Sequence, residues 1–284
     1  MRFLITGAAG MLGVDVHRAA RAAGHEVLAL PRAELDLTDA AAAVDSVLSA
    51  ARPEVVVNCA AWTDVDGAQD DVDGAFAVNA VGAGYLARVA AACGAWTIHI
   101  SSDYVFDGSK REPYLESDLA RPICVYGHSK LEGERAVARA APAAHTIVRS
   151  SWLFGAGGPC FPATILRLAN ERDELSVVDD QVGCPTSTEH LAHALVQLAG
   201  LPRVSGIVHV AGGGECSRYE LATEVVARCG AACRVKPGRT DDFPRPAPRP
   251  AYSVLGTEHG PQVPRLPHWR EGLAAFLAAG VSAA

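Results

Sequence analysis

The sequence is poor in lysine and in aromatic residues. Three lysines (Lys110, Lys130 and Lys236) stand among its 25 basic residues, and aromatic residues make up 6% of the 284 positions. Acidic groups outnumber basic ones by 32 to 25, which gives a formal net charge of −7. Affinity for nucleic acid depends mainly on clustered positive charge, so we expect no nucleic acid among the partners.

Long apolar runs and paired cysteines are missing as well. No apolar stretch approaches the ~18–20 residues that span a bilayer, and residues 1–7 lead into a glycine loop without the layout of a signal peptide. The eight cysteines include no C-x-x-C pair of the kind used in zinc sites. We therefore expect a cytoplasmic protein without a membrane partner, whose cysteines are buried reduced thiols.

The first half of the chain alternates short apolar runs with helix-like stretches. Hydrophobic residues make up 49% of the sequence and charged residues 20%, which is typical of a globular protein. This alternation predicts βαβ units and an α/β fold with a doubly wound parallel sheet of the Rossmann type. The expected strands lie near 3–5, 27–30, 55–57, 97–100 and 146–148, and helices near 11–23, 39–51 and 125–140 and in a region that ends near 93.

Glycine and proline become more frequent after residue 151, and the expected elements become shorter. We predict a dinucleotide-binding domain at 1–150 and a smaller C-terminal substrate-binding cap at 151–284, with some segments returning to the main sheet. Ligands should lie between the two. Helices are expected at 165–172, 189–198, 218–229 and 269–279, and a strand of the main sheet at 207–210.

Three glycines stand between the first strand and the first helix. Gly7 allows a tight turn, Gly10 lets the backbone approach a pyrophosphate, and Gly13 permits close packing of helix on strand. Phosphates would then face the positive end of the helix dipole. The spacing is G-x-x-G-x-x-G rather than G-x-G-x-x-G. The context predicts dinucleotide binding, and a purely structural turn is the alternative.

The end of the second strand indicates which dinucleotide binds. An NAD site usually has an acidic residue there, but this sequence has Arg32 and no carboxylate before Glu34. Arginine suits the 2′-phosphate of NADPH, so we predict NADPH, with NADH as the alternative donor. A surface arginine without a ligand remains the other interpretation. We expect Asp36 and Leu37 to frame the adenine.

Tyr126 and Lys130 are four residues apart on a predicted helix. A nearby ammonium favours the phenolate and lowers its pKa, which would make Tyr126 a usable acid and base. Composition alone makes this spacing rare, because the chain has six tyrosines and three lysines. Ser102 ends the fourth strand, where open α/β sheets place their sites, and its hydroxyl would hydrogen-bond a substrate carbonyl. An ordinary pair on the helix surface is the alternative.

Together these features resemble the extended short-chain dehydrogenase/reductases, and more narrowly the dTDP-4-dehydrorhamnose reductases. The resemblance covers almost the whole chain and is carried by the glycine loop, Tyr126 with Lys130, and the stretches 58–66, 78–80, 101–108, 149–155, 180–186 and 245–247. It implies that NADPH reduces the C4 ketone of dTDP-4-dehydro-6-deoxy-L-hexose (dTDP-4-dehydro-L-rhamnose) to give dTDP-L-rhamnose.

The resemblance also implies roles for individual residues. Tyr126 becomes the proton donor, Lys130 tunes its pKa and binds the nicotinamide ribose, and Ser102 is the partner of the carbonyl. Ser102 stands where the family usually has threonine, and Trp62 where tyrosine or histidine is commoner. The implied contacts are Gly10, Met11 and Leu12 with the pyrophosphate, Ala60, Ala61 and Trp62 with the inner half of the cofactor, and Asp103 and Trp152 with the sugar nucleotide.

Some members of this family are described as metal-bridged dimers. Asp15 and Glu189 are the counterparts of the metal ligands there, but no local cluster in this sequence indicates a metal, so none is predicted. We expect a monomer or a homodimer. Two other functions stay open: a ketoreductase for another dTDP-deoxysugar, such as one for an antibiotic glycoside, and a non-catalytic regulatory subunit that binds NADP.

Overall fold

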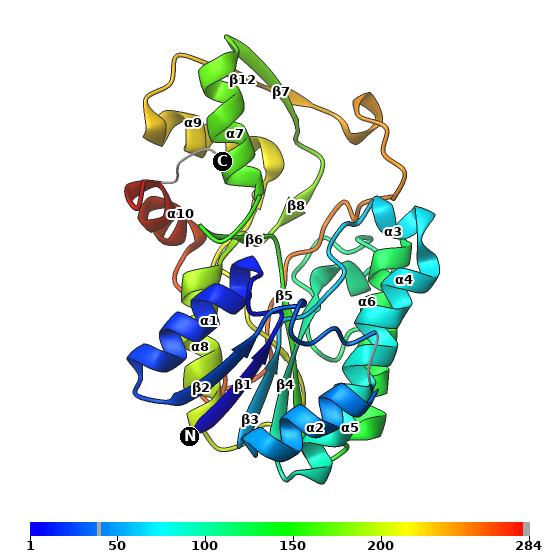
Figure 1. Cartoon of the computed structure of the whole chain (residues 1–284). Coiled ribbons are helices and arrows are strands. Elements are labelled where there is room, and N and C mark those ends of the chain that lie inside the picture. Colours follow the sequence, from blue (N-terminus) through cyan, green and yellow to red (C-terminus); the bar gives the residue numbers. More distant parts are fainter. Residues whose placement is uncertain (39–40, 281–284) are drawn as a thin grey trace.

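A computed structural model describes residues 1–38 and 41–280 and has a six-stranded parallel sheet at its centre (Figure 1). The strand order is β10-β5-β4-β3-β1-β2, which is the doubly wound arrangement expected from the sequence. The strands of this sheet are β1 (Arg2–Thr6), β2 (Glu26–Leu30), β3 (Val55–Asn58), β4 (Trp96–Ser102), β5 (His145–Ser150) and β10 (Gly206–His209).

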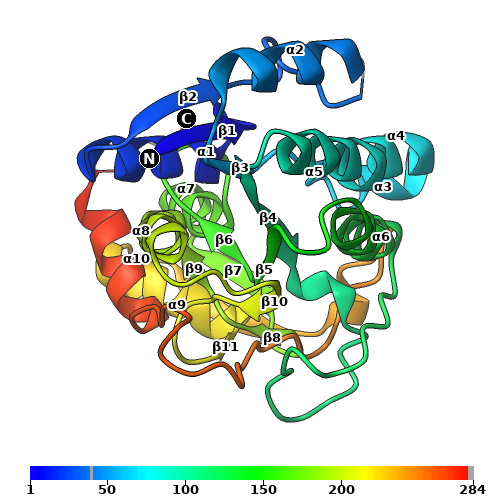
Figure 2. The same cartoon turned by 90° about the horizontal axis from the view of Figure 1, so that it is seen from below.

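Helices cover both faces of the sheet, which explains why its inner strands are apolar on both sides (Figure 2). All four residues of β3 are buried. One face packs against α1 (Met11–Ala22) and α8 (Thr188–Gly200), and the other against α2 (Ala41–Ala51), α5 (Ala83–Ala92) and α6 (Val125–Ala140). Residues 39–40 lie outside the described part of the chain, so the expected start of the second helix at 39 is not tested.

One helical stretch differs from the sequence expectation. Residues 72–92 form α4 (Val72–Phe76), a π-helical turn, η1 (Ala77–Gly82), and α5, and by length and composition this stretch is apolar enough to cross a membrane. Half of its apolar window is buried inside the protein, where α5 packs against α2, α6 and β4. The expectation of no such stretch was therefore wrong, because a core helix between a sheet and other helices has the same composition.

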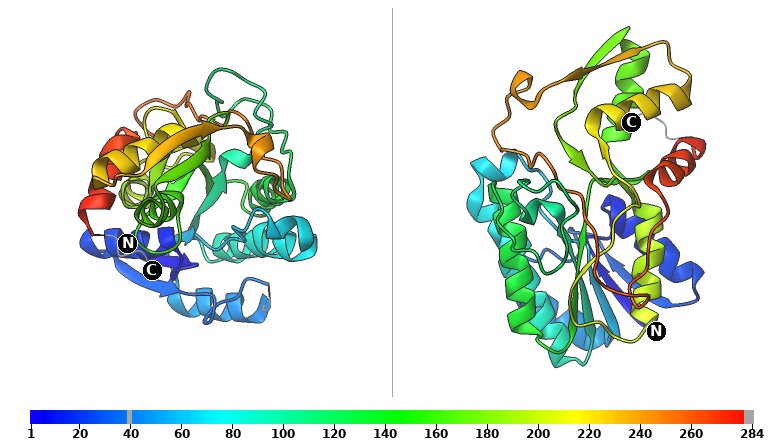
Figure 3. Two further views of the ribbon diagram at one scale, coloured as in Figure 1. Left: turned by 90° about the horizontal axis from the view of Figure 1, so that it is seen from above. Right: turned by 180° about the vertical axis from the view of Figure 1, so that it is seen from behind.

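Apart from α8 and β10, the elements of the C-terminal half lie beyond the carboxyl ends of the strands of the main sheet and have their own core (Figure 3). That core contains Phe154, Leu221, Trp269 and Leu273. The four helices expected after residue 151 are present within a few residues of their expected bounds. One of them, α8, packs on the main sheet, as does β10. The elements are β6 (Leu153–Phe154), α7 (Phe161–Glu171), β7 (Glu174–Val178), β8 (Val182–Gly183), β9 (Thr186–Ser187), β11 (Cys216–Ser217), α9 (Arg218–Cys229), β12 (Arg234–Gly238), η3 (Thr240–Asp242) and α10 (Trp269–Ala278).

The strand expected at 207–210 is confirmed as β10, which pairs in parallel with β5 at the edge of the main sheet. α8 lies beside α1 on one face of the sheet, with Leu191, Leu195 and Leu198 in the same core as β1. The chain thus leaves the sheet after β5, builds part of the outer region, and returns to the sheet with the consecutive elements α8 and β10. The division at residue 150 stays a prediction.

Candidate active site

A cleft of about 720 Å³ opens where the strand ends of the main sheet meet the C-terminal half. Parallel sheets place ligand sites at this edge because the strand ends and helix N-termini converge there. The cleft is lined by every residue that the sequence analysis assigned to a site, namely Gly7, Gly10, Met11, Leu12, Gly13, Arg32, Asp36, Leu37, Ala60, Ala61, Trp62, Ser102, Asp103, Tyr126, Lys130 and Trp152.

The glycine loop is packed too closely to accept side chains. Gly7 has φ +64°, and a Cβ there would lie 2.6 Å from the Ala60 nitrogen. A Cβ on Gly13 would lie 2.3 Å from the Gly7 carbonyl oxygen. Gly10 directly precedes α1, whose first turn carries no acidic residue. The N-terminus of α1 therefore presents its positive dipole end to the cleft, as an anionic ligand requires.

Arg32 and Asp36 form an ion pair at the outer end of the cleft. Arg32 Nε donates to Asp36 at 2.8 Å, and the Thr38 amide donates to the same carboxylate at 2.9 Å. The Thr38 amide and Arg32 together lower the pKa of Asp36 to about 2. The Arg32 side chain is 76% exposed, so the remaining guanidinium N–H groups face solvent.

The loop after β3 is held by a buried asparagine in η1. Asn79 accepts a hydrogen bond from the Trp62 amide at 2.9 Å and donates to the Trp62 carbonyl at 3.1 Å. The Trp62 indole donates to the Asp64 carbonyl. Asn79 thus fixes the backbone that carries Ala60 and Ala61 along the cleft.

Ser102 and Asp103 form a buried hydroxyl–carboxylate group beside Tyr126. The Ser102 hydroxyl donates to Asp103 Oδ1 at 3.0 Å and accepts from the Tyr104 amide. Two further hydroxyls, from Ser151 at 3.2 Å and Ser253 at 2.6 Å, donate to Asp103 Oδ2. The Ser102 proton therefore points to Asp103 in this structure, which the sequence analysis did not foresee.

Burial dominates the acid–base properties of the Tyr126–Lys130 pair. It raises the pKa of Tyr126, against an opposing effect of the Ser102 hydroxyl. It also lowers the pKa of Lys130 to about 8, while Lys130 Nζ donates to the Ile100 carbonyl at 2.7 Å. The expected lowering of the phenol pKa is therefore wrong for this structure, because removal of the phenol from water is the largest influence on its pKa and raises it.

Arg218 and Tyr104 line the same cleft and were missed by the sequence analysis. Arg218 begins α9, and its guanidinium carbon lies 3.5 Å from the centre of the Trp152 ring. Trp152 has a positive φ of 46°, and a Cβ on Gly183 would lie 2.5 Å from its indole. No local motif marks Arg218, because the fold alone brings α9 to the ends of β4 and β5.

A second cavity of about 880 Å³ adjoins the cleft and shares Tyr104 and Arg218 with it. Its walls include Arg172, Arg245, Arg249, Phe161 and Phe243. The carboxylates Glu174 and Asp241 also line the cavity, but its four arginines outnumber them. Positive charge together with aromatic side chains is a combination that suits a nucleotide diphosphate.

A proline-rich segment, the 240–250 strap, closes one side of this cavity and is fastened at both ends. Asp180 accepts hydrogen bonds from the amide and hydroxyl of Thr240. At the other end Asp66, in the loop before α3 (Gly67–Asp70), binds both terminal nitrogens of Arg249 and the Ala247 amide. The strap thus connects the C-terminal half to the loop that carries Trp62.

The residues considered as metal ligands are engaged differently. Asp15 is buried and accepts a hydrogen bond from Thr188 Oγ1 at 2.6 Å, whereas Glu189 is exposed. Within residues 1–38 and 41–280, no group of three or more His, Cys, Asp or Glu side chains is arranged to hold a metal ion.

Comparison with known proteins shows which family the chain belongs to. The family described as the RmlD substrate binding domain matches residues 1–281. The chain belongs to this family. The resemblance to dTDP-4-dehydrorhamnose reductases is thereby confirmed, and so is the fold class.

Individual members are similar over nearly their full length. The chain is 45% identical over 287 residues to the dTDP-4-dehydrorhamnose reductase of Mycolicibacterium smegmatis, covering 99% of this chain and 86% of that protein. It is 40% identical to the dTDP-4-keto-6-deoxy-D-glucose reductase of Streptomyces niveus, covering 96% and 95%. The solved dTDP-4-dehydrorhamnose reductase of Bacillus anthracis, in complex with NADP, aligns with TM-score 0.93 at 35% identity, covering 98% and 99%.

Proposed function

We propose that this protein uses NADPH to reduce the C4 ketone of dTDP-4-dehydro-L-rhamnose, giving dTDP-L-rhamnose. The observation that carries the proposal is one continuous arrangement of three parts. A glycine cradle leads to Ser102, Tyr126 and Lys130, and these lead to the arginine-lined cavity. Relatives with the same reductase name support the substrate, and a solved relative bound to NADP supports the cofactor.

The cleft fits a dinucleotide phosphate. The closely packed glycines leave backbone at the N-terminus of α1 free to approach a pyrophosphate, and Arg32 offers exposed guanidinium N–H groups for a 2′-phosphate. The Ser150 hydroxyl lines the cleft, is buried, and has no hydrogen-bond partner among the described residues. An orphaned buried hydroxyl indicates a missing polar partner at this place.

When bound, NADPH supplies the hydride for the sugar C4 carbon, with NADH as the weaker alternative. Tyr126 keeps its proton at neutral pH because burial raises its pKa, so it is ready to donate to the developing C4 alkoxide. Lys130 provides positive charge near that oxygen, and the Ser102 hydroxyl completes the site once its proton turns from Asp103 to the substrate. A preorganised group of this kind stabilises charge that develops in the transition state.

The sugar nucleotide spans the cleft and the arginine-lined cavity. Trp152 offers a flat apolar surface for the C–H side of the deoxyhexose, and the Arg218 guanidinium stacks over its ring. Arg218 and Arg249 then lie where the diphosphate needs cations. The Asp103 carboxylate already accepts hydrogen bonds from three hydroxyls. Asp103 therefore contributes to sugar binding through its position beside the sugar rather than as an unpaired carboxylate.

A product analysis tests the proposal. The purified protein is incubated with dTDP-4-dehydro-L-rhamnose and NADPH, and the product is identified by NMR, which gives the configuration at C4. The relative from Streptomyces niveus supports a second candidate, a ketoreductase for another dTDP-deoxysugar, which the same assay with dTDP-4-keto-6-deoxy-D-glucose distinguishes. No oxidation of NADPH with either sugar would leave the non-catalytic NADP-binding subunit as the function.

The remaining parts of the proposal concern the setting of the enzyme. We place it in the cytoplasm as a monomer or homodimer, without nucleic-acid or membrane partners. Size-exclusion chromatography with light scattering on the purified protein measures the oligomeric state directly.

A further inference from the structure

Glu134 lies two helical turns beyond Tyr126 on α6, and the reaction described above does not use it. Tyr126, Lys130 and Glu134 are spaced four residues apart, so they share one face of the helix. Glu134 is 3% exposed and Lys130 is 2% exposed. A carboxylate and an ammonium this deeply buried are costly unless other groups compensate them.

Glu134 is held in place by hydrogen bonds from two strands of the sheet. Ser101 on β4 donates to Oε1 at 2.6 Å, and Arg149 on β5 donates to both oxygens at 2.8 and 2.7 Å. The Arg149 side chain is 2% exposed and also stacks over the Phe106 ring. The position of the carboxylate is therefore fixed by the sheet.

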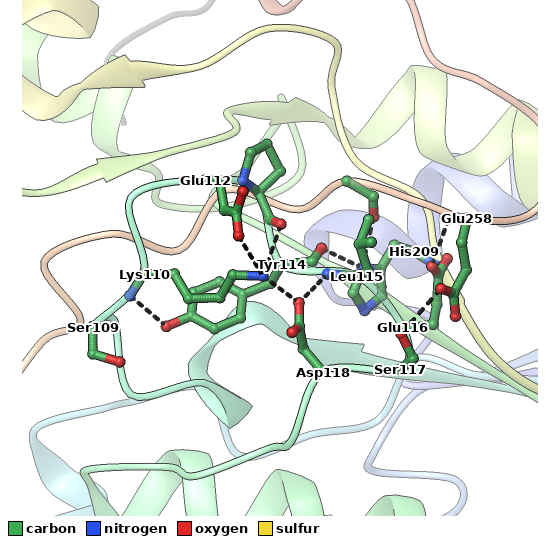
Figure 4. Close-up of polar contacts among 12 residues, drawn as sticks. Ser109, Lys110, Glu112, Tyr114, Leu115, Glu116, Ser117, Asp118, His209 and Glu258 are labelled. Carbon is green, nitrogen blue, oxygen red and sulfur yellow. Dashed lines mark hydrogen bonds and ion pairs between the residues drawn. The ribbon is translucent and has the colours of Figure 1, made fainter.

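The hydrogen-bond network continues from Arg149 to His209 at the end of β10. His209 Nδ1 lies 2.8 Å from the Gly256 carbonyl and 3.1 Å from the Tyr114 carbonyl, so this nitrogen carries the hydrogen (Figure 4). Nε2 then faces Arg149 Nη1 at 3.4 Å as an acceptor. Burial lowers the pKa of His209, so the ring stays neutral and adds no second cation beside Arg149.

Few other groups stabilise the positive charge of Lys130 among the described residues. Its ammonium has three donor hydrogens, and the hydrogen bond that the structure shows is the one to the Ile100 carbonyl. The other titratable groups around it are Tyr126 on its own helix, Cys59 after β3 and His99 on β4. Burial raises the pKa of Tyr126 and of Cys59, the latter to about 12, and lowers that of His99, so all three are neutral near pH 7.

We propose that Glu134, fixed by Arg149 and Ser101, is a positioning residue that keeps Lys130 positively charged in the active site. Its carboxylate is hydrogen-bonded by Arg149, and Lys130 stands one helical turn away on the same buried face of α6, where the carboxylate acts on it through space. Burial and Glu134 act on the pKa of Lys130 in opposite directions, since burial lowers it and the Glu134 carboxylate raises it. The inference rests on the proposed role of Lys130 in the reductase.

The shared carboxylate predicts opposite effects for its two neighbours. Glu134→Gln removes the anion, so the pKa of Lys130 should fall by about one pH unit. Arg149→Met removes the competing cation, and the Ser101 hydroxyl and Lys130 then compensate the buried carboxylate, so the pKa of Lys130 should rise by a similar amount. A loss of packing alone would admit water in both variants and raise the pKa of Lys130 in both.

The scarcity of lysine makes the measurement direct. NMR of the full chain with isotope-labelled lysine gives three side-chain signals, and the Lys130 signal is titrated with pH in each variant. Lys110 and Lys236 pair with Asp118 and Glu174 elsewhere and are internal references. The matched control is Glu132→Gln, also on α6, whose carboxylate pairs with exposed arginines and should leave the Lys130 titration unchanged.

The inference is supported if the Lys130 pKa shifts in opposite directions in Glu134→Gln and Arg149→Met. It is overturned if the pKa does not shift or shifts in the same direction in both variants. If Glu134→Gln does not fold, the double variant Glu134→Gln/Arg149→Met removes the whole ion pair, and its Lys130 pKa must lie below that of Arg149→Met. The titration needs no turnover, so its failure is distinguishable from a failure of the proposed reductase activity.

Discussion

Asp66 fastens the 240–250 strap, and replacing it with asparagine measures how much this connection contributes. Arg249 is the largest cause of the low pKa of Asp66, which falls from 3.8 to about 2. A shift of this size corresponds to about 2 kcal/mol of unfolding free energy at neutral pH. The Asp66 side chain is 26% exposed, so solvent screening reduces this value only in part. The asparagine side chain would keep the size and an acceptor for the Ala247 amide.

The stability of Asp66→Asn should therefore fall by about 1–2 kcal/mol, which lowers Tm by about 2–3 °C in a protein of this size. The pH dependence has a definite sign, because the folded-state pKa lies below the unfolded one. The contribution of Asp66 is fully present above its unfolded pKa of 3.8 and is lost as the pH falls through about 2. The difference between the variants should thus stay constant from pH 7 down to about pH 5.

Urea unfolding of both proteins at several pH values provides the measurement. Asp64→Asn is the matched control, since Asp64 lies in the same loop and accepts a hydrogen bond from the Gly67 amide but pairs with no arginine in the described part of the chain. We expect the KM for the dTDP-sugar to rise in Asp66→Asn because Arg249 lines the second cavity, with NADPH affinity unchanged. If Asp66→Asn were as stable as Asp64→Asn at pH 7, the reasoning about the strap would be refuted.

Other substitutions test the cleft itself. Tyr126→Phe should lower kcat at least ~100-fold with NADPH affinity unchanged; retention of half the activity would remove Tyr126 from the mechanism. Arg32→Ala should weaken NADPH binding about tenfold to a hundredfold in a fluorescence titration and hardly affect NADH; equal losses would make Arg32 structural. Gly183→Ala should displace the Trp152 indole and raise KM for the sugar nucleotide at unchanged NADPH affinity; an unchanged KM would argue against a sugar contact by Trp152.

The sequence predicted the features that depend on neighbouring residues. The glycine loop, the strand that ends at Ser102 and the pair Tyr126 and Lys130 are local patterns, and the structure brings all of them to one cleft. Their chemical environment depends on burial, which sequence spacing does not report. The pKa of Tyr126 was therefore expected to move in the wrong direction.

Contacts between distant parts of the chain were beyond the reach of sequence reasoning. Arg218 meets Trp152 across 66 positions, and Asp66 meets Arg249 across 183. The sequence marked Trp152 and the stretch that ends at Asp66, but it gave no sign of their arginine partners, since neither a first helical arginine nor an arginine in a proline-rich segment marks a site. The apolar stretch at 72–92 shows the converse case, in which a core helix and a membrane helix have the same composition.

The return of the chain to the central sheet has a consequence for synthesis on the ribosome. When β5 has just emerged, its outer edge has no partner, because β10 follows about 60 residues later. The part of the sheet face that α8 covers is also exposed until α8 is made, about 40 residues after β5. An unpaired apolar edge in a nascent chain is a place where aggregation begins. We therefore expect chains released before about residue 210 to need chaperones, and a gene fragment ending at residue 150 to yield insoluble protein.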